Sequence, residues 1–336
     1  MPDRNPGGGR KAASPGFLLW RYFMKSKSNK NAPAREKFTW KKFLESKEWQ
    51  LHLILLPAVI VVFIYSYIPL YGIVIAFQKF APATGFSSPW VGLSNFEFLF
   101  RQPNFVRTIG NTLYIAVFKL VLTQIVSILF ALMLNEVKCS TLKRSVQTVA
   151  YIPNFLSWVV LAGMLIDILS TDGLLNQITG LFGAKPVSFL GNPKVFPWTM
   201  IISDIWKNFG YGAIIYLAAL TSVDPGLYEA AALDGAGRFR RIWHVTLPAI
   251  APTIILMSLL SLGSLLNAGF EQIYNLYSPS VYQTGDIIDT YMYRLGMIEA
   301  QYSFGTAVGL FKSVISCFLI SVSYWAADKF AGYRIL

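Results

Sequence analysis

The chain contains few charged residues and very few residues that commonly bind metals. Asp, Glu, Lys and Arg together make up 14% of its 336 residues, and it has only two cysteines and two histidines. Cys139 and Cys317 lack the neighbouring cysteines or histidines of a zinc site, and their placement does not suit a disulfide. We therefore expect no metal centre, and we interpret His52 and His244 as interfacial side chains rather than as ligands.

A phosphate-binding loop of the form Gly-x-x-x-x-Gly-Lys-Ser/Thr is also missing from the sequence. Such a loop supplies the backbone amides and the lysine that hold nucleotide phosphates in many ATPases. We therefore expect that this chain has no catalytic residues, binds no cofactor and does not itself hydrolyse ATP.

Apolar residues are abundant: 54% of the sequence is hydrophobic, which is high for a soluble domain. Six segments have the roughly 20 apolar residues that a helix needs to cross a bilayer. Strict alternation of apolar and polar residues is absent, so helices are predicted rather than the strands of a barrel. The expected fold is an all-α integral membrane protein with six transmembrane helices, near Leu51–Phe77, Thr108–Leu134, Val146–Leu169, Phe196–Ala219, Val245–Ala268 and Ser303–Ala327.

The net charge of +12 is distributed unevenly along the chain. Twenty Lys and Arg residues lie before Trp49, in the loops around 138–144 and 238–241, and near the C-terminus, against six in the alternate loops. This positive-inside asymmetry predicts a cell-membrane protein with both termini and the loop 224–248 in the cytoplasm. The basic excess is explained by topology and by contact with membrane lipid, and nucleic-acid binding is not expected.

The loop 224–248 contains the start and stop signals of a short helix. Asp224 can act as the N-cap, and Pro225 is tolerated at the first helical position. The run that follows favours helix, and Gly235 is suited to the C-cap. A short helix presented at the membrane surface is a docking element for a partner.

This stretch closely resembles the EAA loop of binding-protein-dependent ABC importers. The resemblance rests on Glu229-Ala230-Ala231, on Gly235 four residues after Ala231 and on Leu247-Pro248, with Val245 where the pattern usually has Ile. It implies the transmembrane domain of a type I ABC importer, in which this loop contacts an ATPase. The residues that it assigns to ATPase coupling are Glu229, Ala230, Ala231, Asp234, Gly235, Arg238, Leu247 and Pro248.

Three other stretches resemble sugar permeases of the maltose-type superfamily: Trp90–Phe96, Gly269–Pro279 and Asp286–Tyr291. The last two are most similar to the branch serving oligo- and polysaccharides, including lipoprotein-linked and alginate-type systems. The resemblance implies a second homologous permease, two cytoplasmic ATPase subunits that use ATP and Mg, and an extracytoplasmic solute-binding protein. It also implies an oligo- or polysaccharide substrate.

Three regions are expected along the chain. Residues 1–48 form a basic cytoplasmic segment with an interfacial helix, and residues 49–107 form the first transmembrane helix and an external loop. Residues 108–336 form the permease core with five transmembrane helices, and this core contains the coupling loop 224–248.

Ionisable residues inside the predicted spans are functional candidates, because a charge in the bilayer core is costly. Polar residues of the fourth span fall on one helical face, and so do those of the fifth span and its exit. Amides and acids can bond sugar hydroxyls while rings stack on sugar faces. The predicted substrate pathway is Asp204, Lys207, Asn208, Tyr211, Asn267, Glu271, Gln272 and Tyr274.

Other interpretations remain open at this point. Asp204 and Lys207 can instead neutralise each other as a structural pair, or Lys207 can favour uronate-bearing substrates. An ABC permease for a non-sugar solute would keep the same loop and differ in its cavity. An ion-coupled secondary transporter could use Lys119, Asp204 and Glu271 in a proton relay, but it would have no use for the EAA-like loop.

Overall fold

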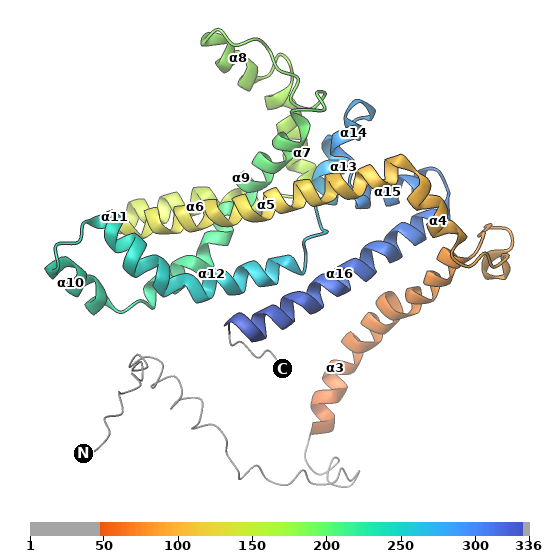
Figure 1. Ribbon diagram of the computed structural model, residues 1–336, viewed down its shortest axis with the longest axis horizontal. Coiled ribbons are helices and arrows are strands. Elements are labelled where there is room, and N and C mark those ends of the chain that lie inside the picture. Colours follow the sequence, from red (N-terminus) through yellow and green to blue (C-terminus); the bar gives the residue numbers. More distant parts are fainter. Residues whose placement is uncertain (1–47, 332–336) are drawn as a thin grey trace, which may run out of the picture. The chain divides into compact units, whose positions relative to one another are not determined.

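The computed structural model describes residues 48–331 (Figure 1). Most of the predicted basic N-terminal segment, with its interfacial helix, lies outside the described residues. The chain divides into two units, Met1–Ile68 and Pro69–Leu336. In the first, helix α3 (Glu48–Val62) continues into a π-helical turn, Phe63–Tyr67. Its side chains from Trp49 onward are exposed and mostly apolar, as expected for a helix surrounded by lipid.

The described residues are helical and contain no β-strand beyond one isolated bridge between Gln78 and Trp90. Within 48–331, five helical segments are long and apolar enough to cross a membrane. They are Trp49–Phe77, Pro103–Glu136, Trp158–Leu181, Arg238–Leu262 and Tyr302–Ala326. The predicted fourth span is present as the 26-residue helix α9 (Phe196–Thr221), but it is not among these five. Of the polar residues that make α9 less apolar, Asp204 and Asn208 line the candidate site and Lys207 does not.

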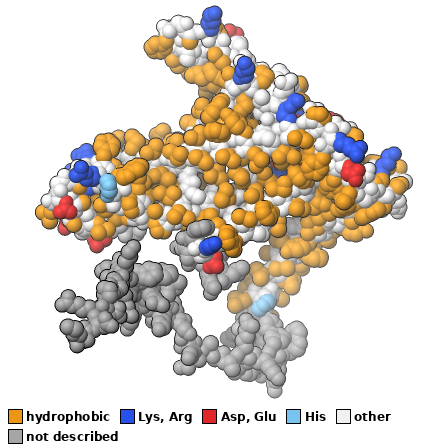
Figure 2. Space-filling view, in the orientation of Figure 1, with side chains coloured by type: hydrophobic (Ala, Val, Ile, Leu, Met, Phe, Trp, Pro, Cys, Tyr) orange, Lys and Arg blue, Asp and Glu red, His pale blue; other side chains and the backbone are white. Residues whose placement is uncertain are grey.

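The second unit is organised around the long helix α5 (Pro103–Glu136), which packs along α9. Near the start of α5 lie the loop helix α4 (Ser94–Arg101) and the short helices α14 (Tyr282–Gly285) and α15 (Ile288–Tyr293). Asn111 of α5 donates hydrogen bonds to the carbonyls of Gln283 and Asp286. Helix α16 (Tyr302–Ala331) packs on α12 (Leu247–Leu262) and α15. On the face shown in Figure 2, hydrophobic side chains cover most of the described surface.

The predicted continuous span Val146–Leu169 is wrong, because the chain breaks at Leu156 and Ser157. Helix α6 (Ser140–Phe155) ends there, and α7 (Trp158–Leu169) begins with the Ser157 side chain accepting from the Val160 amide. A second short helix, α8 (Leu174–Leu181), completes this span. The apolar composition continues across the break, so hydropathy alone did not reveal it.

The predicted span Val245–Ala268 is also interrupted. Helix α12 ends at Leu262, turns occupy the following residues, and Gly269 has a left-handed backbone with φ of 96°. Helix α13 (Phe270–Leu276) begins directly after this glycine. The predicted helical face running from Asn267 to Tyr274 therefore does not exist as one continuous helix.

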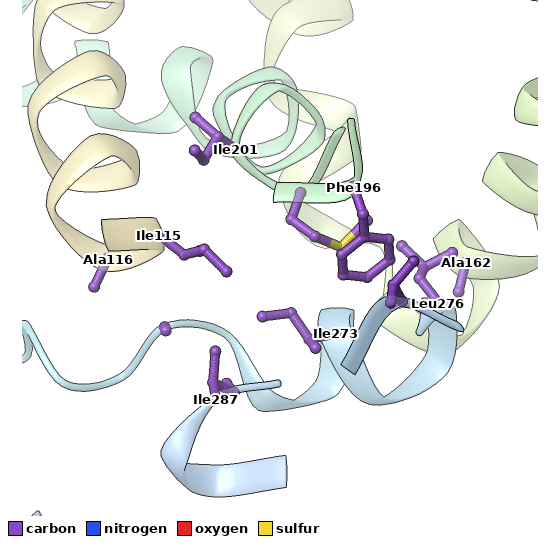
Figure 3. Close-up of a cluster of buried hydrophobic side chains, with 11 residues drawn as sticks. Ile115, Ala116, Ala162, Phe196, Ile201, Ile273, Leu276 and Ile287 are labelled. Carbon is purple, nitrogen blue, oxygen red and sulfur yellow. The ribbon is translucent and has the colours of Figure 1, made fainter. Parts of the chain in front are cut away.

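Three buried clusters hold the second unit together. The largest joins α5, α7, α9 and α13 through residues such as Ile115, Phe196 and Ile273, which point toward one another in Figure 3. A second surrounds Phe105 between α4, α5, α15 and α16, and a third joins Leu132, Leu217 and Ile250 at the other end of α5. The break after α12 lies in this packed core, because Ala268 belongs to the largest cluster.

Candidate functional site

A cavity of about 440 Å³ lies between α5, α9, α12 and the turn after α12. Much of its lining is polar, although most of these residues belong to segments that are otherwise apolar. Hydroxyl and amide groups come from Thr123, Gln124, Ser127, Asn208, Ser264 and Asn267, and Tyr216 adds an aromatic wall. A cavity of this size and chemistry can hold water or a polar solute within a membrane-spanning bundle.

An ion pair lines the same cavity. Lys119 Nζ of α5 lies 3.5 Å from Asp204 Oδ1 of α9, and both side chains are largely buried. The lysine also donates to the Ala268 carbonyl at 2.8 Å and to the Gln272 side-chain oxygen. A buried charge is tolerated when it is paired and hydrogen-bonded, and these contacts meet that requirement.

Gln272 extends this network into the core. Its Nε2 donates to the Met200 carbonyl and to the Ser203 hydroxyl oxygen, each at 2.8 Å. The side chain is completely buried and does not line the cavity. The structure therefore places Gln272 as a link between α13 and α9.

Glycine is favoured at position 269, where the chain passes Lys119. Its φ of 96° is unfavourable for other residues, and an added Cβ would lie 2.8 Å from Lys119 Nζ. The left-handed turn leaves the Ala268 carbonyl outside any helix, where Lys119 binds it. The break in this segment is thus held by a lysine from another helix.

The structure brings three of the predicted pathway residues to the cavity: Asp204, Asn208 and Asn267. Tyr211 and Glu271 are exposed and are not among the lining residues. Tyr274 belongs to a cluster of aromatic rings with Phe270 and Tyr293. Only part of the predicted substrate pathway therefore lines this cavity.

The proposed structural pair of Asp204 and Lys207 is wrong, because Asp204 pairs with Lys119. Lys207 instead donates to the Leu156 carbonyl and, at 3.4 Å, to the carbonyls of Pro153 and Asn154. Its ammonium also lies 5.2 Å from the centre of the Trp158 ring. The i, i+3 spacing of Asp204 and Lys207 permits contact, but the broken α6 offers the lysine three acceptors.

Several cavity residues were missed by sequence reasoning, chiefly Gln124, Ser127, Ser261 and Ser264. A signal was present on α5, since Lys119, Thr123 and Ser127 recur every four residues and so share one helical face. A signal was also present near the end of α12, since Ser258, Ser261, Ser264 and Asn267 recur every three residues. Their contribution depends on where that helix ends.

The loop 224–248 forms the predicted short helix. Helix α10 (Pro225–Leu233) begins with the Asp224 side chain accepting from the Gly226 amide at 2.9 Å. It ends with Gly235 at φ 73°, whose amide donates to Ala232, and the next amide donates to Ala231. These paired bonds form a Schellman motif, so both predicted caps are confirmed.

Helix α10 is presented on the surface. It has no buried residue, and Leu233 at its end is 91% exposed. Glu229, Ala230, Asp234, Gly235, Arg238 and Pro248 are also exposed, whereas Ala231 and Leu247 are half-buried. Tyr228 contacts the Thr246 hydroxyl at 3.1 Å and so fixes α10 to the following helix. Figure 1 shows α10 and α11 (Arg238–Arg241) at the opposite end of α5 from α13 and α15.

Comparisons with known proteins agree on the family. Residues 125–331 match the family of the binding-protein-dependent transport system inner membrane component. The chain is 41% identical over 294 residues to protein LplB of Bacillus subtilis, covering 87% of this chain and 92% of that protein. It is 43% identical over 282 residues to the polygalacturonan/rhamnogalacturonan transport system permease protein YteP of Bacillus subtilis, covering 83% and 88%.

Solved structures agree with this result. The chain is similar to one in a crystal structure of a bacterial ABC transporter involved in the import of the acidic polysaccharide alginate, with 37% identity and a TM-score of 0.78. That match covers 86% of this chain and 99% of the other. A bacterial alginate ABC transporter in complex with an alginate pentasaccharide-bound periplasmic protein gives a TM-score of 0.79 at 37% identity, covering 88% and 99%. The chain therefore belongs to the binding-protein-dependent transport system inner membrane components, the multi-pass permease subunits of ABC importers.

Proposed function

We propose that this permease forms part of the import pathway for an oligo- or polysaccharide. The observation that carries the proposal is the polar cavity at the broken segment, lined by hydroxyls, amides and one internally compensated ion pair. Hydroxyls and amides both donate and accept hydrogen bonds, as sugar hydroxyls do. The named substrates of YteP and of the alginate transporter support this substrate class.

Within this pathway, Asn208 and Asn267 are the direct hydrogen-bonding candidates. Lys119 and Asp204 lie beside them, but each charge is satisfied mainly by the other and by the protein. Lys207 is bound to backbone carbonyls, so it offers little to a uronate carboxylate. Tyr211, Glu271 and Tyr274 remain candidates for contacts outside the cavity.

The exposed helix α10 is the proposed contact with an ATPase. Glu229 would supply a charged contact in a groove of that subunit, and the small Ala230 and Ala231 would allow close approach. The complete importer would then contain a second homologous permease, two cytoplasmic ATPases using ATP and Mg, and an extracytoplasmic binding protein. In this arrangement both termini and α10 face the cytoplasm, and α13 and α15 lie toward the outer side.

A reconstituted complex with its partner subunits and binding protein tests the proposal. We expect saccharide-stimulated ATP hydrolysis and uptake, and Asn208→Ala should reduce uptake while assembly and basal hydrolysis persist. Glu229→Ala is the contrasting variant: it should loosen assembly, since a hydrogen bond to a charged group contributes about 1.5–3 kcal/mol. Uptake that follows a proton gradient without ATP, or that is stimulated only by a non-sugar solute, would contradict the proposed function.

A further inference from the structure

A row of five aromatic rings lies on the segment after Gly269, outside the cavity lining. This ring row consists of Phe270, Tyr274, Tyr277, Tyr282 and Tyr293, and every member is partly exposed. Phe270 stacks on Tyr274 with centroids 5.3 Å apart, and Tyr274 lies 5.0 Å from Tyr293. Tyr277 continues the row at 6.0 Å from Tyr274 and 5.0 Å from Tyr282.

The two faces of α13 are clearly different. Ile273 and Leu276 point into the buried cluster shown in Figure 3, and Gln272 binds α9. Phe270 and Tyr274 are four residues apart and therefore share a face that this core does not cover. Of the ring row, Tyr277 packs against this core, whereas Phe270 and Tyr274 do not belong to it, and the partial exposure of the rings leaves ring surface available to a ligand.

The ring row begins at the edge of the cavity. Asn267 and Gly269 line the cavity, and Phe270 follows directly. The Asn267 side-chain oxygen accepts from Lys312 at 2.9 Å, and Lys312 pairs with Asp289 at 2.6 Å. Tyr293 lies one helical turn after Asp289 on α15, so the same contacts that hold Asn267 also position the ring row.

Next to the ring row, Arg294 and Asp286 balance each other, while Glu271, between Phe270 and Tyr274, is exposed. Arg294 pairs with Asp286 at 2.5 Å, and its guanidinium lies 4.4 Å from the centre of the Tyr282 ring. Burial opposes the charge of Arg294, but the hydrogen bond and the charge of Asp286 outweigh this and raise its pKa. Burial raises the pKa of Tyr277 to about 12, with a smaller contribution from Tyr282. The rings of the row are therefore neutral and present hydroxyls.

We infer that the ring row binds the part of a saccharide chain that extends beyond the cavity on its outer side. This inference rests on the proposed function. The cavity that this chain contributes, about 440 Å³, is of a size that suits a small ligand, so a longer saccharide must continue past Asn267. Partly exposed rings offer apolar faces to the sugar, and their hydroxyls offer hydrogen bonds. The row recognises sugar faces and not carboxylates.

Uptake by the reconstituted complex, measured with a disaccharide and a pentasaccharide of the same galacturonan series, tests this inference. Tyr274→Leu and Tyr293→Leu each retain apolar volume but remove the ring face. Because the two residues lie on separate helices, α13 and α15, the same result from both variants would not depend on local damage to one helix. We expect either change to slow pentasaccharide uptake by about threefold to tenfold, the range of one aromatic contact, and to leave disaccharide uptake unchanged. Tyr274→Phe keeps the ring face and loses only the hydroxyl, so it should slow pentasaccharide uptake less than Tyr274→Leu does.

Tyr114→Leu is the matched control. Tyr114 packs against Phe118 and Trp198 in another partly exposed ring cluster, and it is not among the described residues that line the cavity. It should affect neither saccharide. The inference would be overturned if both ring-row variants took up the pentasaccharide as fast as the control does. It would also be overturned if the variants slowed uptake of the two saccharides equally. Either result would leave the proposed function in place. A wild-type complex whose ATP hydrolysis and uptake respond to a non-sugar solute and to neither saccharide would overturn both.

Discussion

At each of the two broken spans of this permease, a lysine from another helix binds backbone carbonyls. The two lysines differ in their other partners. At the α6–α7 break, Lys207 binds the carbonyls of Leu156, Pro153 and Asn154. At the α12–α13 break, Lys119 binds the Ala268 carbonyl. A helix end inside a membrane leaves carbonyl oxygens without partners, and an ammonium group from a neighbouring helix can satisfy them.

The difference lies in the counter-ion. Lys119 is paired with Asp204 and lines the cavity, whereas the described residues provide no ion pair for Lys207. Lys207 is instead held by carbonyl dipoles and lies beside the Trp158 ring. A lysine in a membrane span is therefore not by itself a sign of a substrate site. The groups that a lysine contacts show whether it lines a cavity or binds the carbonyls at the end of a helix.

The largest expected effect is at Lys119. Lys119→Met leaves Asp204 without its ion-pair partner and the Ala268 carbonyl without its donor. Breaking one side of a buried pair costs about 3–5 kcal/mol, so we expect a strongly lowered unfolding temperature of the complex in detergent. Adding Asp204→Asn to Lys119→Met should recover part of this loss. If the double variant is no more stable than Lys119→Met alone, the pair is not the dominant interaction.

Lys207→Met should have a smaller effect, because no carboxylate is left unpaired. The loss of charge-assisted hydrogen bonds to the α6 carbonyls is expected to cost about 1.5–3 kcal/mol. Lys207→Arg, which keeps a cation near the same acceptors, should retain more stability than Lys207→Met. Adding Asp204→Asn should not rescue Lys207→Met. A rescue as large as that at Lys119 would show that the two breaks share one counter-ion and would remove the distinction between them.

Features with local causes were predictable from the sequence. The caps of α10 depend on Asp224 and Gly235 within the same short segment, so the sequence alone revealed them. The existence of most spans followed from hydropathy, because lipid imposes length and composition directly. Of the predicted coupling residues, Glu229, Ala230 and Ala231 lie on the surface helix α10, Arg238 begins α11, and Leu247 and Pro248 begin α12, while their contact with an ATPase stays a prediction.

Features that depend on distant partners were not predictable. The spacing along one helix left open a pair between Asp204 and Lys207, but the partner of Asp204 lies on α5. The break after α12 had a local signal in Gly269, yet the apolar run across it favoured a continuous helix. Of the predicted pathway residues, Asp204, Asn208 and Asn267 line one cavity, and their role in a pathway stays a prediction; Ser261 and Ser264 were missed. Tertiary packing decided which polar groups face the cavity.

The smallest expected change in stability is at Gly269. The direction of this change can be compared with that of the same substitution at Gly163. Gly269→Ala places a Cβ 2.8 Å from Lys119 Nζ at a φ of 96°, and a left-handed alanine costs about 1–2 kcal/mol. Gly163→Ala on α7 is the matched control, because its Cβ would meet no atom within 4 Å and its helical backbone favours alanine. The unfolding temperature should therefore fall for Gly269→Ala and stay equal or rise for Gly163→Ala. Because the flexible Lys119 side chain can shift away from the new methyl group, Gly269→Ala should be milder than Lys119→Met. If the unfolding temperature of Gly269→Ala is unchanged, the left-handed turn does not fix the position of the Ala268 carbonyl. Lys207 at the α6–α7 break would then be the only lysine shown to bind carbonyls that a break holds in place.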